Sequence, residues 1–133
     1  MVDEKMYPKL AEDVINSIDV KEGDAVLISG GAHAQKFLEE IGIAVAKRGG
    51  QPFITAVSND YQKRLLEACT VPQLKQMPKI MMGAAQAMDA YVIIEPYSDP
   101  SIKAHFREKL QARSEGNFPV QQIVYGKPGK RWL

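Results

Sequence analysis

The chain has 133 residues and a formal net charge of +1, with 45% hydrophobic and 25% charged residues. This length allows one domain with a real hydrophobic core, and this composition excludes the disordered and fibrous classes. No apolar run reaches membrane-spanning length, and the N-terminus lacks the pattern of a secretory signal, so no membrane partner is expected. Cys69 is the single cysteine, which excludes an internal disulfide and is typical of a reducing cytoplasm, where we expect the protein to be located.

The charge is distributed unevenly along the chain. Residues 101–133 carry seven Lys or Arg and two Glu, a net charge of +5, so residues 1–100 carry −4. A basic segment can bind nucleic acid. The aromatic residues here do not interleave with the charges in any pattern known from RNA or DNA binding. We therefore interpret the basic residues as a solvated helix face and a basic turn, with no nucleic-acid partner.

The first half of the chain alternates between helical and strand patterns. An apolar stripe predicts a first helix from Tyr7 to Ile18, and a second stripe predicts another from Phe37 to Arg48, closed by Gly49-Gly50. Strands are predicted over Ala25–Ser29 and Gln51–Val57. The first of these strands is apolar on both faces, which is typical of a parallel sheet covered on both sides.

A third helix is predicted to begin at Asp60, as its cap, and to end near Thr70. Pro72 and Pro78 then break the chain into short pieces. The next segment has an apolar face of small and medium side chains that predicts a fourth helix packed closely on the sheet. The residues of this face are Ile80, Met81, Ala84, Ala85 and Met88.

The last part of the chain begins with a strand predicted over Asp89–Glu95. Asp99-Pro100 then provides a cap and a proline at the first helical position. The helix that follows has Ile102, Phe106 and Leu110 on its apolar face. The segment Val120–Tyr125 is compatible either with a strand or with the end of a helix. Lys130–Leu133 is typical of a strand that starts after a tight turn, so we expect this chain to be the front part of a longer one.

These patterns predict an α/β protein with a three-layer αβα architecture. The sheet would be short and parallel, with three to four strands and helices on both faces, in one Rossmann-like domain over residues 1–133 without a dinucleotide fingerprint. The sequence leaves the strand order open. In such sheets ligands bind at the carboxyl ends of the strands.

Five residues at that edge are candidates for ligand binding: Ser29, Gly30, Gly31, His33 and Glu95. The two glycines belong neither to a dinucleotide fingerprint nor to a P-loop. They either cradle an anion with their N–H groups or form a tight strand-to-helix turn. His33 either binds a ligand or is a partly exposed turn residue, and Glu95 either faces the crevice or caps a loop.

No catalytic residue and no metal ligand set is predicted in this span. Two histidines lie seventy-two positions apart, at 33 and 105, with no His-Glu-x-x-His motif and no carboxylate cluster beside either. Other carboxylates occur as adjacent pairs, which diverge on a helix and indicate solvated faces.

The order of several short motifs resembles the N-terminal domain of the thermophilic aminopeptidase T-type family of metallopeptidases. These motifs are Val20-Lys-x-Gly-Asp-x-Val-Leu-Ile28, Gly49-Gly-Gln-Pro52, Asp89-Ala90, Asp99-Pro100 and Gly129-Lys-Arg-Trp132. In that family a pair of divalent metals (zinc, cobalt or manganese) activates a water that attacks the N-terminal peptide bond.

The resemblance implies that the metal ligands lie in a C-terminal catalytic domain of the same chain. This span would then be non-catalytic, shape the substrate cavity and take part in dimerisation, which makes a homo-oligomer the expected assembly. Two alternatives remain. One is a free-standing module that binds a small anion or a protein partner. The other is the scaffold domain of a related iron-dependent ring-cleaving dioxygenase.

Overall fold

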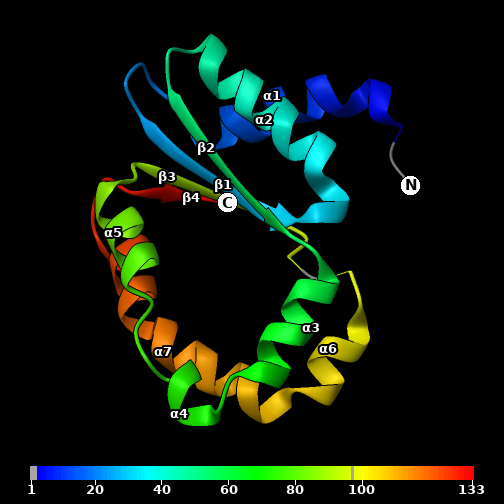
Figure 1. Cartoon of the computed structure of the whole chain (residues 1–133). Helices are drawn as coiled ribbons and strands as arrows, with labels where there is room; N and C mark the ends of the chain where they lie inside the picture. The colour runs from blue at the N-terminus through cyan, green and yellow to red at the C-terminus, as the bar shows by residue number, and fades with distance from the viewer. Residues whose placement is uncertain (1–2, 97) are drawn as a thin grey trace.

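The computed structural model describes residues 3–96 and 98–133. Its centre is a sheet of four parallel strands in the order β2-β1-β3-β4 (Figure 1). The strands are β1 (Ala25–Gly31), β2 (Gln51–Val57), β3 (Ala90–Ile94) and β4 (Arg131–Trp132). The predicted α/β class with a short parallel sheet is confirmed, and the strand order that the sequence left open is now defined.

Strand β1 lies between two parallel partners along most of its length. It pairs with β2 from Ala25 opposite Gln51 to Gly31 opposite Val57, and with β3 from Val26 to Gly30. The strand therefore continues two residues past the predicted end at Ser29. It does so because both glycines remain within the ladder to β2.

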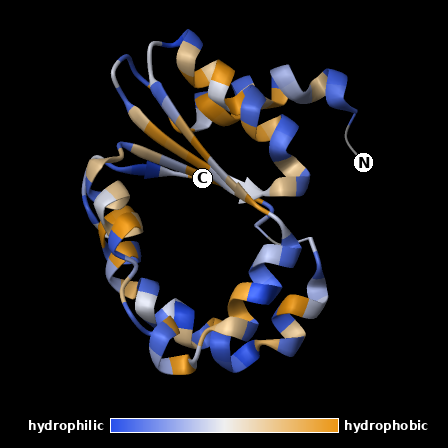
Figure 2. Cartoon of the chain, in the orientation of Figure 1, coloured by the Kyte–Doolittle hydropathy of each residue, from blue (hydrophilic) through white to orange (hydrophobic). Residues whose placement is uncertain are grey.

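One face of the sheet is covered by α1 (Tyr7–Ser17) and α2 (Gln35–Lys47), each preceded by a 3-10 turn, η1 (Glu4–Met6) and η2 (Ala32–Ala34). Their apolar stripes contact the even-numbered side chains of β1 and β3 and form the largest core cluster. Figure 2 shows hydrophobic residues along these strands and more polar residues on the outer helix surfaces. The buried members are Ala11, Ile15, Ile18, Val20, Val26, Ile28, Leu38, Ile41, Ala44, Val45, Ala90 and Val92.

The other face is covered in part by α5 (Lys79–Ala87) and the C-terminal half of α7 (Arg107–Gly126). Leu27 of β1 packs here with four buried helix or helix-end residues: Ala85, Met88, Val120 and Val124. The segment Val120–Tyr125, for which the sequence allowed either a strand or a helix end, is thus the end of a helix. Ile80 was predicted on the buried face of α5 but is 91% exposed, because α5 turns Met81, Ala84 and Ala85 toward the core instead.

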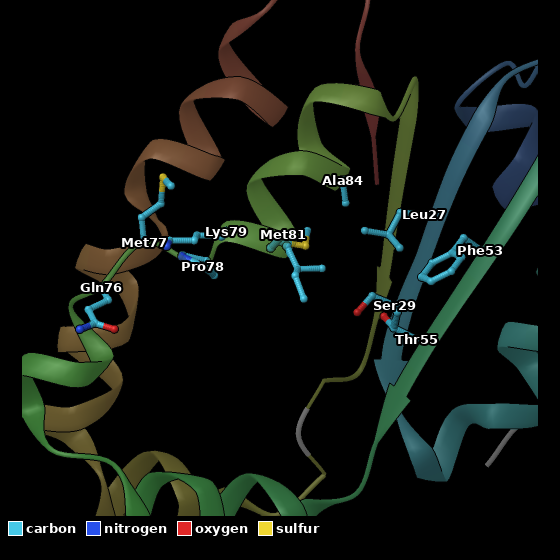
Figure 3. A pocket seen from close by; sticks show the side chains of 11 residues that line it. Leu27, Ser29, Phe53, Thr55, Gln76, Met77, Pro78, Lys79, Met81 and Ala84 are labelled. Atoms are coloured by element: carbon cyan, nitrogen blue, oxygen red, sulfur yellow. The ribbon is translucent and has the colours of Figure 1, made fainter.

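Beside α5, part of this sheet face stays open. Leu27 and Ser29 of β1 and Phe53 and Thr55 of β2 form one wall of a cavity of about 700 Å³ (Figure 3). The opposite wall is formed by residues 76–81 and Ala84. Phe53 is 66% exposed as a result.

A second group of helices packs together away from the sheet (Figure 1). It comprises α3 (Asn59–Ala68), α4 (Val71–Leu74), α6 (Pro100–His105) and the start of α7. Its buried residues are Leu66, Leu74, Ile102 and Ala112. Besides the three predicted layers, the chain therefore forms a small helical group that has a hydrophobic core of its own.

Two predicted helix boundaries need correction. Ser58, rather than Asp60, caps α3, because the Ser58 hydroxyl accepts a hydrogen bond from the Tyr61 N–H at 3.0 Å. The helix predicted to run through Phe106 breaks there into α6 and α7, because Phe106 adopts φ −117° and ψ 36°, outside the helical region. The predicted cap of α6 is confirmed, since the Asp99 carboxylate accepts a hydrogen bond from the Ser101 N–H.

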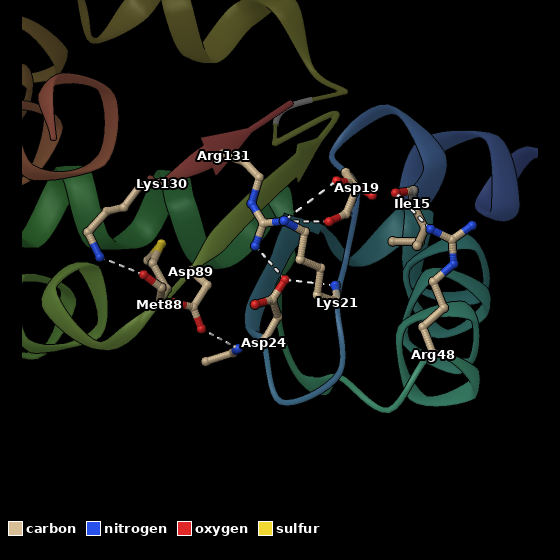
Figure 4. Close-up of polar contacts among 10 residues, drawn as sticks. Ile15, Asp19, Lys21, Asp24, Arg48, Met88, Asp89, Lys130 and Arg131 are labelled. Carbon is tan, nitrogen blue, oxygen red and sulfur yellow. Dashed lines mark hydrogen bonds and ion pairs between the residues drawn. The ribbon is translucent and has the colours of Figure 1, made fainter. Parts of the chain in front are cut away.

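Polar contacts join the amino-terminal ends of β1, β3 and β4 (Figure 4). The Arg131 guanidinium forms an ion pair with the Asp24 carboxylate and donates a hydrogen bond to the Asp19 carbonyl. The Asp89 carboxylate accepts a hydrogen bond from the Ala25 N–H at 2.9 Å. These contacts fix the first residues of β3 and β4 to the turn that precedes β1.

Two basic residues of the C-terminal segment, Lys109 and Lys130, contact helix ends. The Lys109 ammonium donates a hydrogen bond to the Leu66 carbonyl in the last turn of α3, and the Lys130 ammonium donates one to the Met88 carbonyl after α5, each at 2.6 Å. Cations at such positions satisfy free carbonyls and complement the helix dipole. No helix in residues 3–96 and 98–133 is both long and apolar enough to span a membrane.

Candidate functional site

The carboxyl ends of β1 and β3 approach each other closely at the two glycines. The Gly31 N–H donates a hydrogen bond to the Glu95 carbonyl at 3.1 Å. A Cβ on Gly30 would lie 2.4 Å from the Ile94 carbonyl oxygen. Glycine is therefore required at Gly30 by backbone proximity. The Gly31 N–H is already used within the protein, so in this arrangement it does not point to a bound anion.

His33 and Glu95 meet directly above this contact. The His33 Nε2 atom lies 3.2 Å from a Glu95 carboxylate oxygen. The imidazole ring folds back over Gly31, where an added Cβ would lie 2.2 Å from its Cε1 atom. Gly31 therefore makes room for the ring, and the ring in turn holds the carboxylate.

Glu95 has a backbone conformation that is uncommon for a side-chain-bearing residue. Its φ is +38°, in the left-handed region that favours glycine. This turn brings the Glu95 carbonyl to the Gly31 N–H and the carboxylate to His33. Strained residues of this kind occur frequently at binding and active sites, so Glu95 is the residue of this edge with the strongest structural indication of function.

His33 and Glu95 line a cavity of about 510 Å³ whose remaining wall is mostly apolar. The rings of Tyr7 and Phe37 contribute to it, with their centroids 5.2 Å apart. Its other lining residues are Leu10, Ala34 and Ile94. The sequence placed Tyr7 and Phe37 on apolar helix faces, and their periodicity gives no signal that distinguishes a cavity wall from a core position.

Ser29 lies apart from this cavity. Side chains alternate along a strand, so Ser29 shares a face with Leu27, while Ile28 faces α1 and α2. Ser29 therefore lines the open cavity beside α5 (Figure 3). Burial raises the pKa of the neighbouring Tyr91 hydroxyl, and its hydrogen bond with Ser29 acts in the opposite direction.

Asn59 and Asp60, which the strand order also brings toward this edge, do not line the His33 cavity. The Asn59 side chain instead bonds Ser98, accepting from its N–H at 3.3 Å. Asp60 pairs along its own helix with Arg64. The loops that follow β2 and β3 are thus tied to each other.

Within the described ranges, no group of three or more His, Cys, Asp or Glu side chains is arranged to hold a metal ion. His33 has Glu95 as its polar partner, and His105 packs edge-on against Phe106 with ring centroids 5.4 Å apart. These residues do not fit the ligand set of a metal pair.

The fold is that of an α/β protein with a parallel sheet. No family model and no curated protein matches the sequence. Among solved structures, the chain is similar to wild-type AmpT from Thermus thermophilus, an aminopeptidase, with a TM-score of 0.76 and 17% sequence identity. The similarity covers 98% of this chain and 35% of the AmpT chain, so this chain spans about a third of that protein's length.

Proposed function

We propose that this chain is the N-terminal, non-catalytic domain of a metal-dependent aminopeptidase that removes N-terminal residues from peptides. The observation that carries the proposal is the similarity to AmpT over 98% of the chain at a TM-score of 0.76. The motif order described above supports the same family. At 17% identity the similarity itself is one of fold.

The catalytic residues and the divalent metal pair belong, in this proposal, to a C-terminal domain of the same polypeptide. Such a pair would supply Lewis-acid activation of a water. The described residues of this chain provide no ligand set for it, so no catalytic step is assigned to them. Their part is to build walls of the substrate cavity and to support the dimer.

The open sheet face is the surface that we assign to contact with the catalytic domain. Parallel sheets are normally covered on both faces. Here Phe53 and Ile80 remain 66% and 91% exposed beside the open cavity. Contiguous apolar surface of this kind usually marks an interaction site.

The test is to express the uninterrupted reading frame that contains these 133 residues and to assay it with aminoacyl-nitroanilides. We expect hydrolysis that is lost on treatment with a chelator and restored by zinc, cobalt or manganese. The substitution Phe53→Asp should reduce this activity by disturbing the domain contact, whereas Phe118→Asp, at an exposed phenylalanine of α7, should leave it unchanged. A gene product with no chelator-sensitive hydrolysis would contradict the proposal.

A further inference from the structure

We propose that the His33–Glu95 cavity binds an organic ammonium ion, meaning a protonated amine carried on an apolar body. This inference does not depend on the aminopeptidase proposal. It rests on the charge of the cavity, on its walls and on the contacts that orient its carboxylate.

The charge of the cavity is negative. Of the described residues that line it, Glu95 is the one carboxylate, and none is a lysine or an arginine. One Glu95 oxygen contacts the imidazole, and no hydrogen bond to the other oxygen is formed within the described part of the chain. The nearby Lys36 ammonium is held by Glu4, at 3.2 Å from each carboxylate oxygen. The Glu95 carboxylate is therefore available to a cation that enters the cavity.

The walls of the cavity suit an apolar body with a cationic head. Tyr7 and Phe37 present aromatic rings, and Leu10, Ala34 and Ile94 add aliphatic surface. Aromatic faces attract ammonium groups through their quadrupole. A volume of about 510 Å³ lies within the range of about 300 to 1,000 Å³ that is usual for small-molecule sites.

Contacts orient the Glu95 carboxylate before any ligand arrives, although the Glu95 side chain is 71% exposed. Glu95 is held at φ +38° by the hydrogen bond of its carbonyl with the Gly31 N–H, and its carboxylate is held by His33. His33 is fixed in turn by its packing on Gly31. A group that is already oriented loses less conformational entropy on binding, which is one use of a strained residue.

The test compares two probes of equal shape on the 133-residue chain labelled with ¹⁵N. These probes are 2-phenylethylamine, which is an ammonium ion at pH 8, and the neutral 2-phenylethanol. We expect saturable amide shifts at residues 31–34 and 94–95 with the amine, and at least about fivefold weaker binding of the alcohol, the factor expected for one solvent-accessible ion pair. Equal affinities, shifts centred elsewhere, or no saturation would overturn the proposal.

Two variants separate the role of the carboxylate from other effects. Glu95→Gln keeps the side-chain size and should lower the amine affinity to that of the alcohol. Glu108→Gln removes an exposed carboxylate of α7, at a distance from the cavity, and should leave both affinities unchanged. If Glu95→Gln left the amine affinity unchanged, the assigned anchor would be wrong. None of these measurements involves hydrolysis, so a failed aminopeptidase assay would not affect them.

Discussion

Three glycines of this chain have different surroundings, and these surroundings decide what each substitution would do. Gly30 faces a backbone carbonyl, and Gly31 faces the His33 ring and the Glu95 carbonyl. A Cβ added at Gly83 would have no described heavy atom within 4 Å, apart from its chain neighbours and the adjacent backbone of its own helix. The sequence showed a Gly-Gly turn, but it could not show that Gly31 adopts the ordinary extended φ of −75° and that packing is the reason for glycine there.

We predict that Gly30→Ala destabilises the protein by about 2 kcal/mol, because the β3 backbone would have to move. Gly31→Ala should cost less, since the imidazole can rotate away and the Glu95 carbonyl oxygen, 2.8 Å from an added Cβ, is farther than the 2.4 Å of the Ile94 carbonyl oxygen at Gly30. Gly83→Ala should stabilise α5 by up to about 1 kcal/mol through helix propensity. Urea unfolding of the three variants checks this order. A Gly30→Ala variant as stable as the unsubstituted protein would show that the ends of β1 and β3 are not closely packed.

A second prediction at the residue scale concerns the loss of stability at low pH. Hydrogen bonds from Lys63 and Ser101 lower the pKa of the Asp99 carboxyl from 3.8 to about 2. Its folded-state pKa is thus below the unfolded value, so its stabilising contribution is present above about pH 4 and is lost as the pH falls toward 2. Asp99→Asn, which retains a capping side chain, should flatten the dependence of the melting temperature on pH in this window.

The control variant for Asp99→Asn is Asp60→Asn. Asp60 has an exposed carboxylate in the first turn of α3, where it is not the capping residue. Thermal melts from pH 2 to pH 5 should show the flattening for Asp99→Asn alone. Equal slopes for both variants would mean that the Asp99 contacts make no special contribution.

At the scale of elements, periodicity and caps predicted the helices and strands well where a single pattern ran unbroken. The predicted span Gln51–Val57 is the observed β2, and Gly49, at φ +81°, ends α2 as expected. The break at Phe106 was missed because Ile102, Phe106 and Leu110 have helical spacing and all pack in one core cluster even though the helix is interrupted.

The site was predictable only in part. The sequence predicted a candidate site at the carboxyl edge of the sheet, and the contacts among Gly31, His33 and Glu95 lie at this edge. Ser29 was grouped with them because it directly precedes Gly30 and Gly31 at the carboxyl end of β1. The alternation of side chains along the strand places the Ser29 side chain on the other face of the sheet. The positive φ of Glu95 could not be predicted from the sequence, because non-glycine residues rarely adopt this conformation.

The short strand β4 allows a prediction at this scale. The Asp24 and Arg131 side chains are only 14% and 26% exposed, so their ion pair is shielded from solvent. Asp24→Asn should cost about 2 kcal/mol, because the guanidinium loses its charge partner. It should also speed hydrogen exchange of the Leu133 amide, which bonds the Tyr91 carbonyl.

Asp19→Asn is the matched control, because Asp19 contacts Arg131 through its backbone carbonyl and has an exposed side chain. Asparagine also tolerates the positive φ of +50° at this position. If both variants unfolded at the same urea concentration as the unsubstituted protein, the Asp24–Arg131 pair would not anchor β4.

At the scale of the whole molecule, a four-stranded parallel sheet carries two helices on one face, part of two more on the other, and a helical group with its own core. Among the cavities of the described residues, the open cavity lies over β1 and β2 and another lies at His33 and Glu95. The sequence predicted the layers from a first strand that is apolar on both faces. It could not predict the open cavity, because Phe53 and Ile80 look like core residues until the path of α5 is known.

The central proposal is that these 133 residues form a non-catalytic domain of an aminopeptidase. The most direct measurement is hydrolysis of leucyl-nitroanilide by the purified 133-residue chain with zinc, cobalt or manganese, beside the product of the uninterrupted reading frame under the same conditions. We predict turnover by the longer product and none by the 133-residue chain, whose described residues offer no ligand set for the metals. Metal-dependent turnover by the 133-residue chain, surviving removal of contaminating peptidases, would contradict the account.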